Sequence, residues 1–461
     1  MKLPKILIFV FLIILINTYS IEIDFSNTPT TNSDYTVERN TVILSKEDVY
    51  KLTGSSNNYN IKVSSSCSII LDSLTLSSPS FAPILIEENK VVNINLNGES
   101  TLSDTSSNQN EGVIYLNEEA KLIIDGKGIL NISPNKHMGI FGKESSSFIV
   151  NGGTINIKSN ANNVGGIYLS KEIIFNDGNY NFNIDINVLN NINPPSVIDS
   201  NGFITIKKGK YDIISGEGKG IKTESYLYIG NSGDNDKDLE LKIETRNKGI
   251  EAKRIEILSG NITITSYGDG INAINDQCNV NCTGNCDCYM KIEGGNITIN
   301  SGEDGIDSKG DIFINNGQLV VFGASSGDNQ PIDKDGLLNI SGGIVLAGGS
   351  PVLGGVQANT TQTEGVYVKH IDMGAKIEFY EEKGNTQIIE IKAPKAVEYL
   401  YFSFSEKNFI MKLNGVEVDT NSTSIFNLKQ PDSTQNMFLD NNSFFIGLSN
   451  IFFVLFAFIL F

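Results

Sequence analysis

The sequence of 461 residues has no tryptophan, only two histidines, and few charged side chains, which make up 19% of the chain. His137 and His370 lie in unrelated segments, so no Ser-His-Asp set or other histidine constellation is recognisable. Between Ile21 and Asp440, apolar residues almost never recur with a helical period. These absences argue against a helical fold and against catalysis that depends on a histidine.

The abundant residue types predict short strands and an acidic surface. Glycine occurs 44 times, and asparagine, serine, threonine and isoleucine are frequent, which is typical of short strands joined by tight turns. The formal net charge is −18. Such a charge argues against nucleic acid and anionic lipid as direct partners, and it is compatible with a protein that holds divalent cations.

Residues 1–20 have the pattern of a secretory signal peptide. Lys2 and Lys5 form a basic start, an apolar segment runs from Ile6 to Ile16, and small residues stand at Thr18 and Ser20. The apolar segment is too short to span a bilayer. We therefore expect a secreted protein.

Residues 431–461 have the pattern of a signal for a glycosylphosphatidylinositol (GPI) anchor. An apolar run from Phe444 to Phe461 ends the chain without a following Lys or Arg, and a mostly polar spacer precedes it. We expect the anchor at Asp432 or Ser433, and a plain spanning tail is the alternative. The expected location is the extracellular face of the plasma membrane, with membrane contact only through this anchor or tail.

Secretion also predicts disulfides and glycans. A short insertion contains Cys278, Cys282, Cys286 and Cys288, which predict two local disulfides of undecided pairing. A zinc knuckle is the alternative, although no histidine is near. Sequons for N-glycosylation begin at Asn131, Asn261, Asn281, Asn296, Asn339, Asn359, Asn421 and Asn441.

A repeat of strands and turns dominates the middle of the chain. The segment GIEAKRIEILSGNITITSYGD begins at Gly249, a restart follows 21 residues later at Gly270, and another begins at Gly305. Weaker restarts are found as far back as Gly139. Each unit holds three short alternating strands separated by turns, which is typical of one coil of a three-faced parallel β-helix.

We therefore predict an all-β, right-handed parallel β-helix over residues 71–349. Because the open ends of a solenoid must be covered, residues 21–70 are expected to form an N-terminal cap and residues 350–430 a β-rich C-terminal cap. Alternating runs at Lys376–Tyr380, Gln387–Ile391 and Tyr399–Phe404 predict strands in the latter.

Several segments resemble a bacterial carbohydrate-binding β-helix family. They are FAPILIEENKVVNINLNGESTLSD, LIIDGKGILNI, the MGI and GGI restarts, GDGINA and EDGIDSKGDIFINNG, within roughly residues 60–420. The resemblance implies a fold similar to calcium-dependent pectate lyases, bound calcium, and binding of cellulose and polygalacturonate. Lys219 and Lys248 depart from the family pattern Gly-Asp-Gly-Ile, because the restarts there read GKGI and NKGI.

Aligning the restarts places acidic and amide side chains at equivalent positions of successive coils, about 4.8 Å apart. Carboxylates this close raise each other's pKa unless they share a cation, and Ca²⁺ binds carboxylate, amide and carbonyl oxygens. Solvated turn residues are the alternative. The predicted calcium ligands are Glu251, Asp269, Asn272, Asp304, Asp307 and Asp333.

The sequence thus predicts non-catalytic, calcium-assisted binding of an acidic polysaccharide such as polygalacturonate, or of cellulose. A structural or adhesive protein is one alternative. A calcium-dependent pectate lyase is another, with Lys219, Lys248 or Lys309 as the base. Because tryptophan is absent, Tyr226, Tyr228 and Tyr267 are the candidate sugar platforms.

Overall fold

The computed structural model describes residues 20–79, 81–105, 112–161, 164–184, 194–234, 236–275, 278, 287–350, 355–382, 386–418 and, for the backbone, 425–429. Several predicted features lie outside these residues and stay predictions. They are residues 1–19 of the signal peptide, the anchor signal with Asp432 and Ser433, Cys282, Cys286, Asn281, Asn421 and Asn441.

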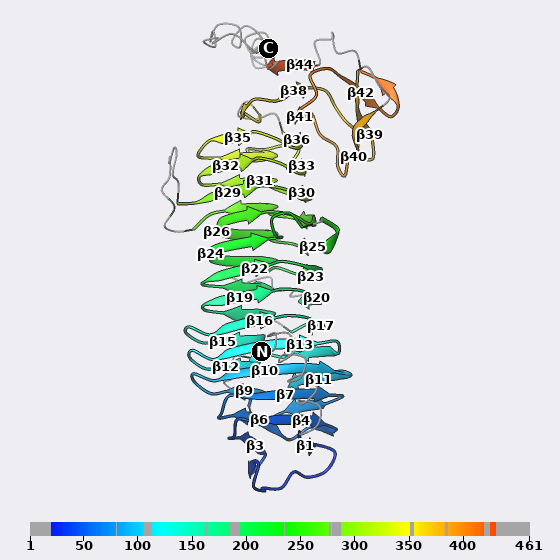
Figure 1. Cartoon of the computed structure of the whole chain (residues 1–461). Coiled ribbons are helices and arrows are strands. Elements are labelled where there is room, and N and C mark those ends of the chain that lie inside the picture. Colours follow the sequence, from blue (N-terminus) through cyan, green and yellow to red (C-terminus); the bar gives the residue numbers. More distant parts are fainter. Residues whose placement is uncertain are drawn as a thin grey trace, which may run out of the picture.

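The prediction of an all-β parallel β-helix is confirmed. Figure 1 shows coils stacked into an elongated column, with a smaller β unit at its C-terminal end. Within the described ranges the one helical element is the short 3-10 turn η1 (Asp236–Asp238). The same ranges contain no helix that is both long and apolar enough to cross a bilayer.

Each coil contributes one strand to each of three faces, and strands of one face pair in parallel with those of the neighbouring coils. Face 1 holds the strands that follow the restarts. They are β3 (Thr41–Leu44), β6 (Asn60–Val63), β9 (Ile84–Ile86), β12 (Gly112–Leu116), β15 (Met138–Gly142), β18 (Ile167–Leu169), β21 (Ile198–Ser200), the first halves of β24 (Ile221–Ile229) and β26 (Ile250–Ile257), β28 (Ile271–Ala273), β31 (Ile306–Ser308) and β34 (Ile332–Lys334).

Faces 2 and 3 complete the coils. Face 2 consists of β1 (Ile21–Asp24), β4 (Val49–Thr53), β7 (Cys67–Asp72), β10 (Val91–Asn97), β13 (Lys121–Gly126), β16 (Ser147–Val150), β19 (Glu172–Phe175), β22 (Phe203–Ile206), the second halves of β24 and β26, β29 (Tyr289–Ile292), β32 (Asp311–Ile314), β35 (Leu338–Ile340) and β37 (Asn359–Thr360). Face 3 consists of β5 (Ser55–Ser56), β8 (Thr75–Ser78), β11 (Glu99–Asp104), β14 (Ile129–Ser133), β17 (Thr154–Ser159), β20 (Asn179–Ile184), β23 (Gly209–Ser215), β25 (Leu239–Thr245), β27 (Asn261–Ser266), β30 (Asn296–Ser301), β33 (Gln318–Phe322) and β36 (Ile344–Gly349).

Glycine recurs at the restarts because adjacent coils leave no room for a side chain there. A Cβ atom at Gly249 would lie 2.6 Å from the carbonyl oxygen of Gly270, and one at Gly270 would lie 2.5 Å from that of Gly305. Both distances are below van der Waals contact, so the strand of face 1 starts at the same point of the coils that have this glycine. The row of side chains that follows is therefore kept in register.

The ends of the column are covered differently. At the N-terminal end, β2 (Thr36–Glu38) pairs antiparallel with β3. The parallel pairing of β1 with β4 shows that coils already exist within residues 21–70, where we expected a cap. At the other end, β41 (Tyr399–Phe404) pairs antiparallel with β36, which stops the parallel ladder.

The C-terminal unit confirms the strands predicted there. β38 (Thr363–Tyr367) and β44 (Ile425–Lys429) extend the sheet beyond β41, and β39 (Lys376–Glu381), β40 (Gln387–Lys392), β42 (Phe409–Leu413) and β43 (Val416–Glu417) form a separate antiparallel sheet. The apolar core of this unit includes Phe379, Phe402 and Phe404, and it is shared with Phe322 and Leu346 of the last coils. The predicted β-rich C-terminal cap is thus present.

Candidate functional site

Face 1 presents one central side chain per coil, because its strands are short and the neighbours of that side chain point inward. We call this line of residues the central row. Strand register places its members next to one another from coil to coil. In order, the central row consists of Lys62, Leu85, Tyr115, Phe141, Tyr168, Asp199, Lys222, Glu251, Asn272, Asp307 and Asp333.

The predicted neighbours at the C-terminal end of the row are brought together. Asn272 pairs with Asp307, and Asp307 with Asp333, in the strand register that the restarts predicted. The Asn272 Nδ2 donates hydrogen bonds to Asp269 Oδ2 at 2.8 Å and to Asp307 Oδ2 at 3.0 Å. Asn272 is completely buried, and its Oδ1 has no hydrogen-bond partner among the described residues. A buried acceptor of this kind is available to water, a ligand or a cation.

Asp304 stands at the corner between face 3 and face 1, beside the row. Its backbone N–H donates to Asp269 Oδ1 at 3.2 Å, which links the two turns as predicted. The Asp304 Oδ1 accepts a hydrogen bond from the backbone N–H of Gln330 at 2.5 Å. The Gln330 Nε2 in turn donates to Asp333 Oδ1 at 3.4 Å. We call Asp269, Asp304, Asp307 and Asp333 the carboxylate cluster.

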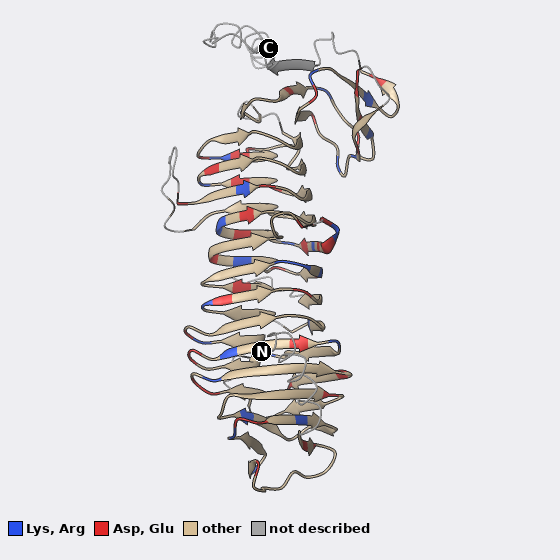
Figure 2. Ribbon diagram, in the orientation of Figure 1, with Lys and Arg blue, Asp and Glu red and all other residues tan. Residues whose placement is uncertain are grey.

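Lysines flank the carboxylate cluster, and on its N-terminal side they form ion pairs with the acidic side chains. Both oxygens of Glu251 face lysines, with Lys219 Nζ at 2.6 Å from Oε1 and Lys248 Nζ at 3.7 Å from Oε2. Lys248 also lies 3.0 Å from Asp269 Oδ2, and Lys309 lies 3.5 Å from Asp307 Oδ1. Figure 2 shows blue and red bands following one another along these coils. The departure from the family pattern at Lys219 and Lys248 is thus matched by ion pairs.

The carboxylates are close enough to disfavour each other's ionised form. Burial raises the pKa of Asp304 to about 7, and the carboxylates of Asp269, Asp333 and Asp307 add to this rise against the opposing hydrogen bond from Gln330. Burial likewise raises the pKa of Asp307, although Lys309 opposes it. Ionising all the carboxylates of the cluster is therefore unfavourable in free energy, and a bound cation would reduce this repulsion.

This cost predicts a pH-dependent stability. The Asp304 carboxyl has a pKa of 3.8 before the shift and about 7 in the fold, so between these values the folded chain holds a proton that the unfolded chain has lost. Without calcium, stability should fall by about 2 kcal/mol from pH 5 to pH 8, and Asp304→Asn should remove most of that dependence. Urea unfolding in chelator at both pH values measures it. Asp328→Asn, at an exposed position before Gln330, is the control, and an unchanged slope in Asp304→Asn would contradict the assignment.

Three aromatic members of the row were not predicted from the sequence. Tyr115, Phe141 and Tyr168 occupy the position after the restart isoleucine in VIYL, GIFG and GIYL, which is the position of Asn272 and Asp307 in later coils. Extending the same alignment to the weaker restarts would have found them. Their rings stack from coil to coil, with centroids 5.6 Å and 5.3 Å apart.

The three tyrosines proposed as sugar platforms are not together. Tyr226 and Tyr228 lie on face 2, where their ring planes are parallel to within 2° and the Arg254 guanidinium lies 4.8 Å from the ring centroid of Tyr226. Tyr267 is 74% exposed and is separated from Asp269 by Gly268 alone. Of the three, only Tyr267 is beside the carboxylate cluster.

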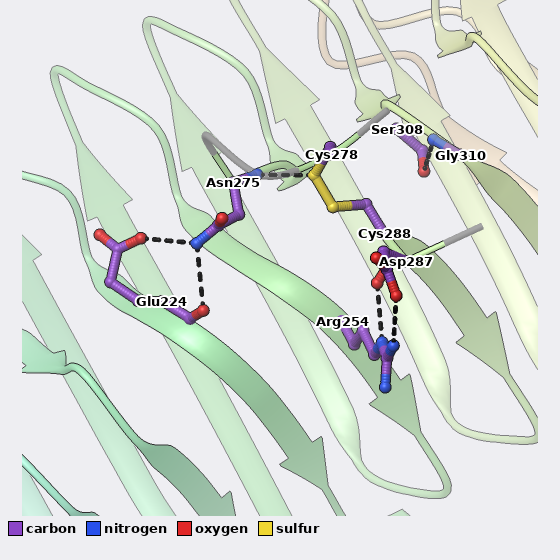
Figure 3. Close-up of a disulfide and its surroundings, with 8 residues drawn as sticks. All are labelled: Glu224, Arg254, Asn275, Cys278, Asp287, Cys288, Ser308 and Gly310. Atoms are coloured by element: carbon purple, nitrogen blue, oxygen red, sulfur yellow. Dashed lines mark hydrogen bonds and ion pairs between the residues drawn. A yellow bond between two sulfur atoms is a disulfide. The ribbon is translucent and has the colours of Figure 1, made fainter. Parts of the chain in front are cut away.

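A disulfide between Cys278 and Cys288 closes the base of the cysteine-rich insertion, next to face 2 (Figure 3). Arg254 is held to the same place, since its Nε and Nη2 donate to the backbone oxygen and Oδ1 of Asp287 at 2.7 and 3.0 Å. Asn275 donates to Glu224 Oε2 at 2.9 Å on the other side of the insertion. Cys67 is a free cysteine, buried in the core.

With Cys278 bonded to Cys288, two disulfides require a Cys282–Cys286 bond. Mass spectrometry of the non-reduced peptide that spans Cys278 to Cys288 should therefore show the loss of four hydrogens relative to the reduced peptide. Partial reduction should release the inner pair without opening the outer one. Free thiols at Cys282 and Cys286, or stoichiometric zinc, would contradict the second bond.

Five of the sequon asparagines can be placed. Asn131, Asn261, Asn296, Asn339 and Asn359 have side chains that are exposed or half-buried. Several form hydrogen-bonded ladders between coils: Asn296 Nδ2 donates to Asn261 Oδ1 at 3.0 Å, and Asn359 Nδ2 donates to Asn339 Oδ1 at 3.1 Å. A glycan on the donor nitrogen would compete with that bond, so glycosylation at these sites stays a prediction.

The model of a family described as carbohydrate-binding domain-containing protein matches residues 38–235 and 237–373, which include the complete central row. No curated protein matches. The solved structure of the polysaccharide lyase-like protein from C. thermocellum, a gadolinium derivative, shares 19% identity over 70% of this chain and 96% of that chain, with a TM-score of 0.26. A TM-score this low carries no argument about fold or site.

Proposed function

We propose that this protein binds an acidic polysaccharide of the polygalacturonate type along face 1. The chain belongs to the family of carbohydrate-binding domain-containing proteins, which supports a polysaccharide as the ligand. The observation that carries this proposal is the carboxylate cluster, whose members lie on adjacent coils and of which Asp304 has its pKa raised to about 7. A straight, regularly spaced array of groups suits a polymer with a regular repeat.

Calcium is proposed as the bridge between two acidic partners. The cluster offers carboxylate oxygens and the unpartnered Asn272 Oδ1, which are the hard oxygen donors that Ca²⁺ prefers. Among the described residues no three acidic, histidine or cysteine side chains are grouped closely enough to hold a metal by themselves. Carboxylates of the polymer and water would therefore complete the coordination. Glu251 is left out of the proposed site, because its oxygens face Lys219 and Lys248.

Long-range charge alone would keep the two partners apart. A chain with net charge −18 repels a uronate polymer, and salt screens this repulsion only beyond about 10 Å. Affinity must then come from short-range contacts, and several weak contacts on successive coils add along one polymer chain. Tyr267 provides an exposed ring beside the cluster for packing against a sugar.

Binding without cleavage is proposed, rather than lyase activity. A lyase needs an uncharged base next to the proton it removes. Lys248 and Lys309, the lysines closest to the carboxylate cluster, are both ion-paired with its carboxylates, which favours their charged form. Charged lysines at these positions support binding of uronate carboxylates and not removal of a proton. A purely structural or adhesive role would not explain why carboxylates lie close together on adjacent coils, since no described contact of the fold requires this closeness.

Removal of calcium is the direct test. Polygalacturonate should retain the secreted protein in a pull-down with millimolar calcium and release it in excess chelator, because the bridge is lost. Binding that resists chelator would leave lysine–uronate contacts as the source of affinity. Failure to bind any acidic polysaccharide with calcium present would contradict the proposed function.

A further inference from the structure

We propose that Tyr115, Phe141 and Tyr168, the three aromatic members of the central row, form a separate binding site for a neutral polysaccharide chain. The chemical class is a β-linked hexose polymer with equatorial hydroxyls, because such rings present flat C–H surfaces. This proposal rests on the proposed function, since it uses the same face, but its residues and its ligand are different.

The three rings form a continuous apolar strip. Ring planes are inclined by 18° between Tyr115 and Phe141 and by 20° between Phe141 and Tyr168. Three successive coils make the strip about 10 Å long. Phe141 and Tyr168 are half-buried, so part of each ring is at the surface, whereas Tyr115 is only 8% exposed and closes the N-terminal end of the strip. Outward positions of a solenoid are ordinarily polar, and an aromatic strip at such positions is typical of an interaction site.

Polar pockets lie on both sides of this strip. Where face 1 leads into face 2, a pocket of about 630 Å³ is lined by Tyr168, Ser170 and Asn201, and the Asn201 Nδ2 donates to the Tyr168 hydroxyl at 2.9 Å. Where face 3 leads into face 1 in the same coils, a pocket of about 660 Å³ is lined by Ser103, Ser159 and the opposite charges of Asp104 and Lys158, among other residues. Apolar rings between hydroxyl and amide groups match the two kinds of surface on a sugar.

The charges of this region favour a neutral ligand. The pocket next to Tyr168 is lined by one negative and one positive side chain, Glu144 and Lys171. The Lys143 Nζ lies 5.8 Å from the ring centroid of Tyr115. No carboxylate belongs to the row between Leu85 and Tyr168, and the carboxylates that line the two pockets, Asp104 and Glu144, lie on opposite sides of the strip and not together. A uronate would find no cation bridge at this end of the face.

The two sites are separated along the column. Asn272 follows Tyr168 by four coils in the row, which is about 19 Å at the spacing of parallel strands. One polymer with neutral and acidic stretches could contact both sites. Because they share no residue, they can be inactivated one at a time.

The test is titration calorimetry of the full secreted chain with cellohexaose. Phe141→Ala with Tyr168→Ala should weaken this binding at least about tenfold, the size expected for loss of aromatic anchors, while calcium-dependent polygalacturonate binding stays unchanged. Phe203→Ala, which removes an aromatic ring 45% exposed on face 2, is the matched control. If the double alanine variant does not fold, Phe141→Leu with Tyr168→Leu keeps an apolar surface without rings and should show the same loss.

Three outcomes would overturn the inference. They are no cellohexaose binding by the unchanged protein, full binding by both double variants, or an equal loss in Phe203→Ala. The first of these, seen together with polygalacturonate binding, rejects the neutral site and leaves the proposed function standing. Loss of polygalacturonate binding in every condition rejects the proposed function instead.

Discussion

Asp304→Asn combined with Asp307→Asn should abolish calcium-dependent polygalacturonate binding while the chain remains folded. Asparagine keeps the shape of each side chain and removes two negative charges from the cluster. Calcium affinity depends strongly on the number of charged ligands, so we expect a loss of about a hundredfold or more. The measurement is polygalacturonate binding at saturating calcium, with a thermal unfolding curve to show that the fold survives.

A matched control separates this local effect from net charge. Glu240→Gln with Glu244→Gln also removes two carboxylates, from exposed positions of β25 on face 3, where they pair with Lys210 and Lys242. Both double variants change the net charge by the same amount. The control should bind polygalacturonate like the unchanged protein, because exposed ion pairs contribute little. Normal binding by the Asp304 and Asp307 variant would place the acidic-polymer site elsewhere.

The substitution Phe175→Ala is expected to destabilise the column by about 3–5 kcal/mol, the usual cost of removing a buried aromatic ring. Phe175 is completely buried, and its ring centroid lies 4.7 Å from that of Tyr180, 5.6 Å from that of Tyr211 and 6.1 Å from that of Phe148. These rings join three successive coils, so the cavity would weaken the contacts on both sides of one coil. Urea unfolding followed by circular dichroism measures the loss.

Phe203→Ala is the control for this experiment as well. The ring of Phe203 is 45% exposed, so its removal should cost less than about 1 kcal/mol. Since coils contact only their neighbours, the Phe175 variant is also expected to unfold in a broader transition. Equal stability of the two variants would show that the aromatic cluster does not hold these coils together.

The repeat, and with it the fold, can be predicted from the order of residues alone. Gly249, Gly270 and Gly305 recur because stacked coils leave no space for a Cβ atom, and the alternation of apolar residues decides which side chains enter the core. Local rules of this kind are visible in one coil. They were sufficient to predict that Asn272, Asp307 and Asp333 would be neighbours.

How those neighbours affect one another's charge depends on the packed column and cannot be predicted from the repeat. The distances of Lys219 and Lys248 from Glu251 depend on how long side chains bend between coils, which no spacing predicts. The rise in the pKa of Asp304 arises from burial first, and burial is a property of the packed column. The register also continues the row into Tyr115, Phe141 and Tyr168, whose role depends on pockets formed by turns of neighbouring coils. Repeats specify which residues stack, whereas charge, burial and cavities emerge only when the coils are stacked.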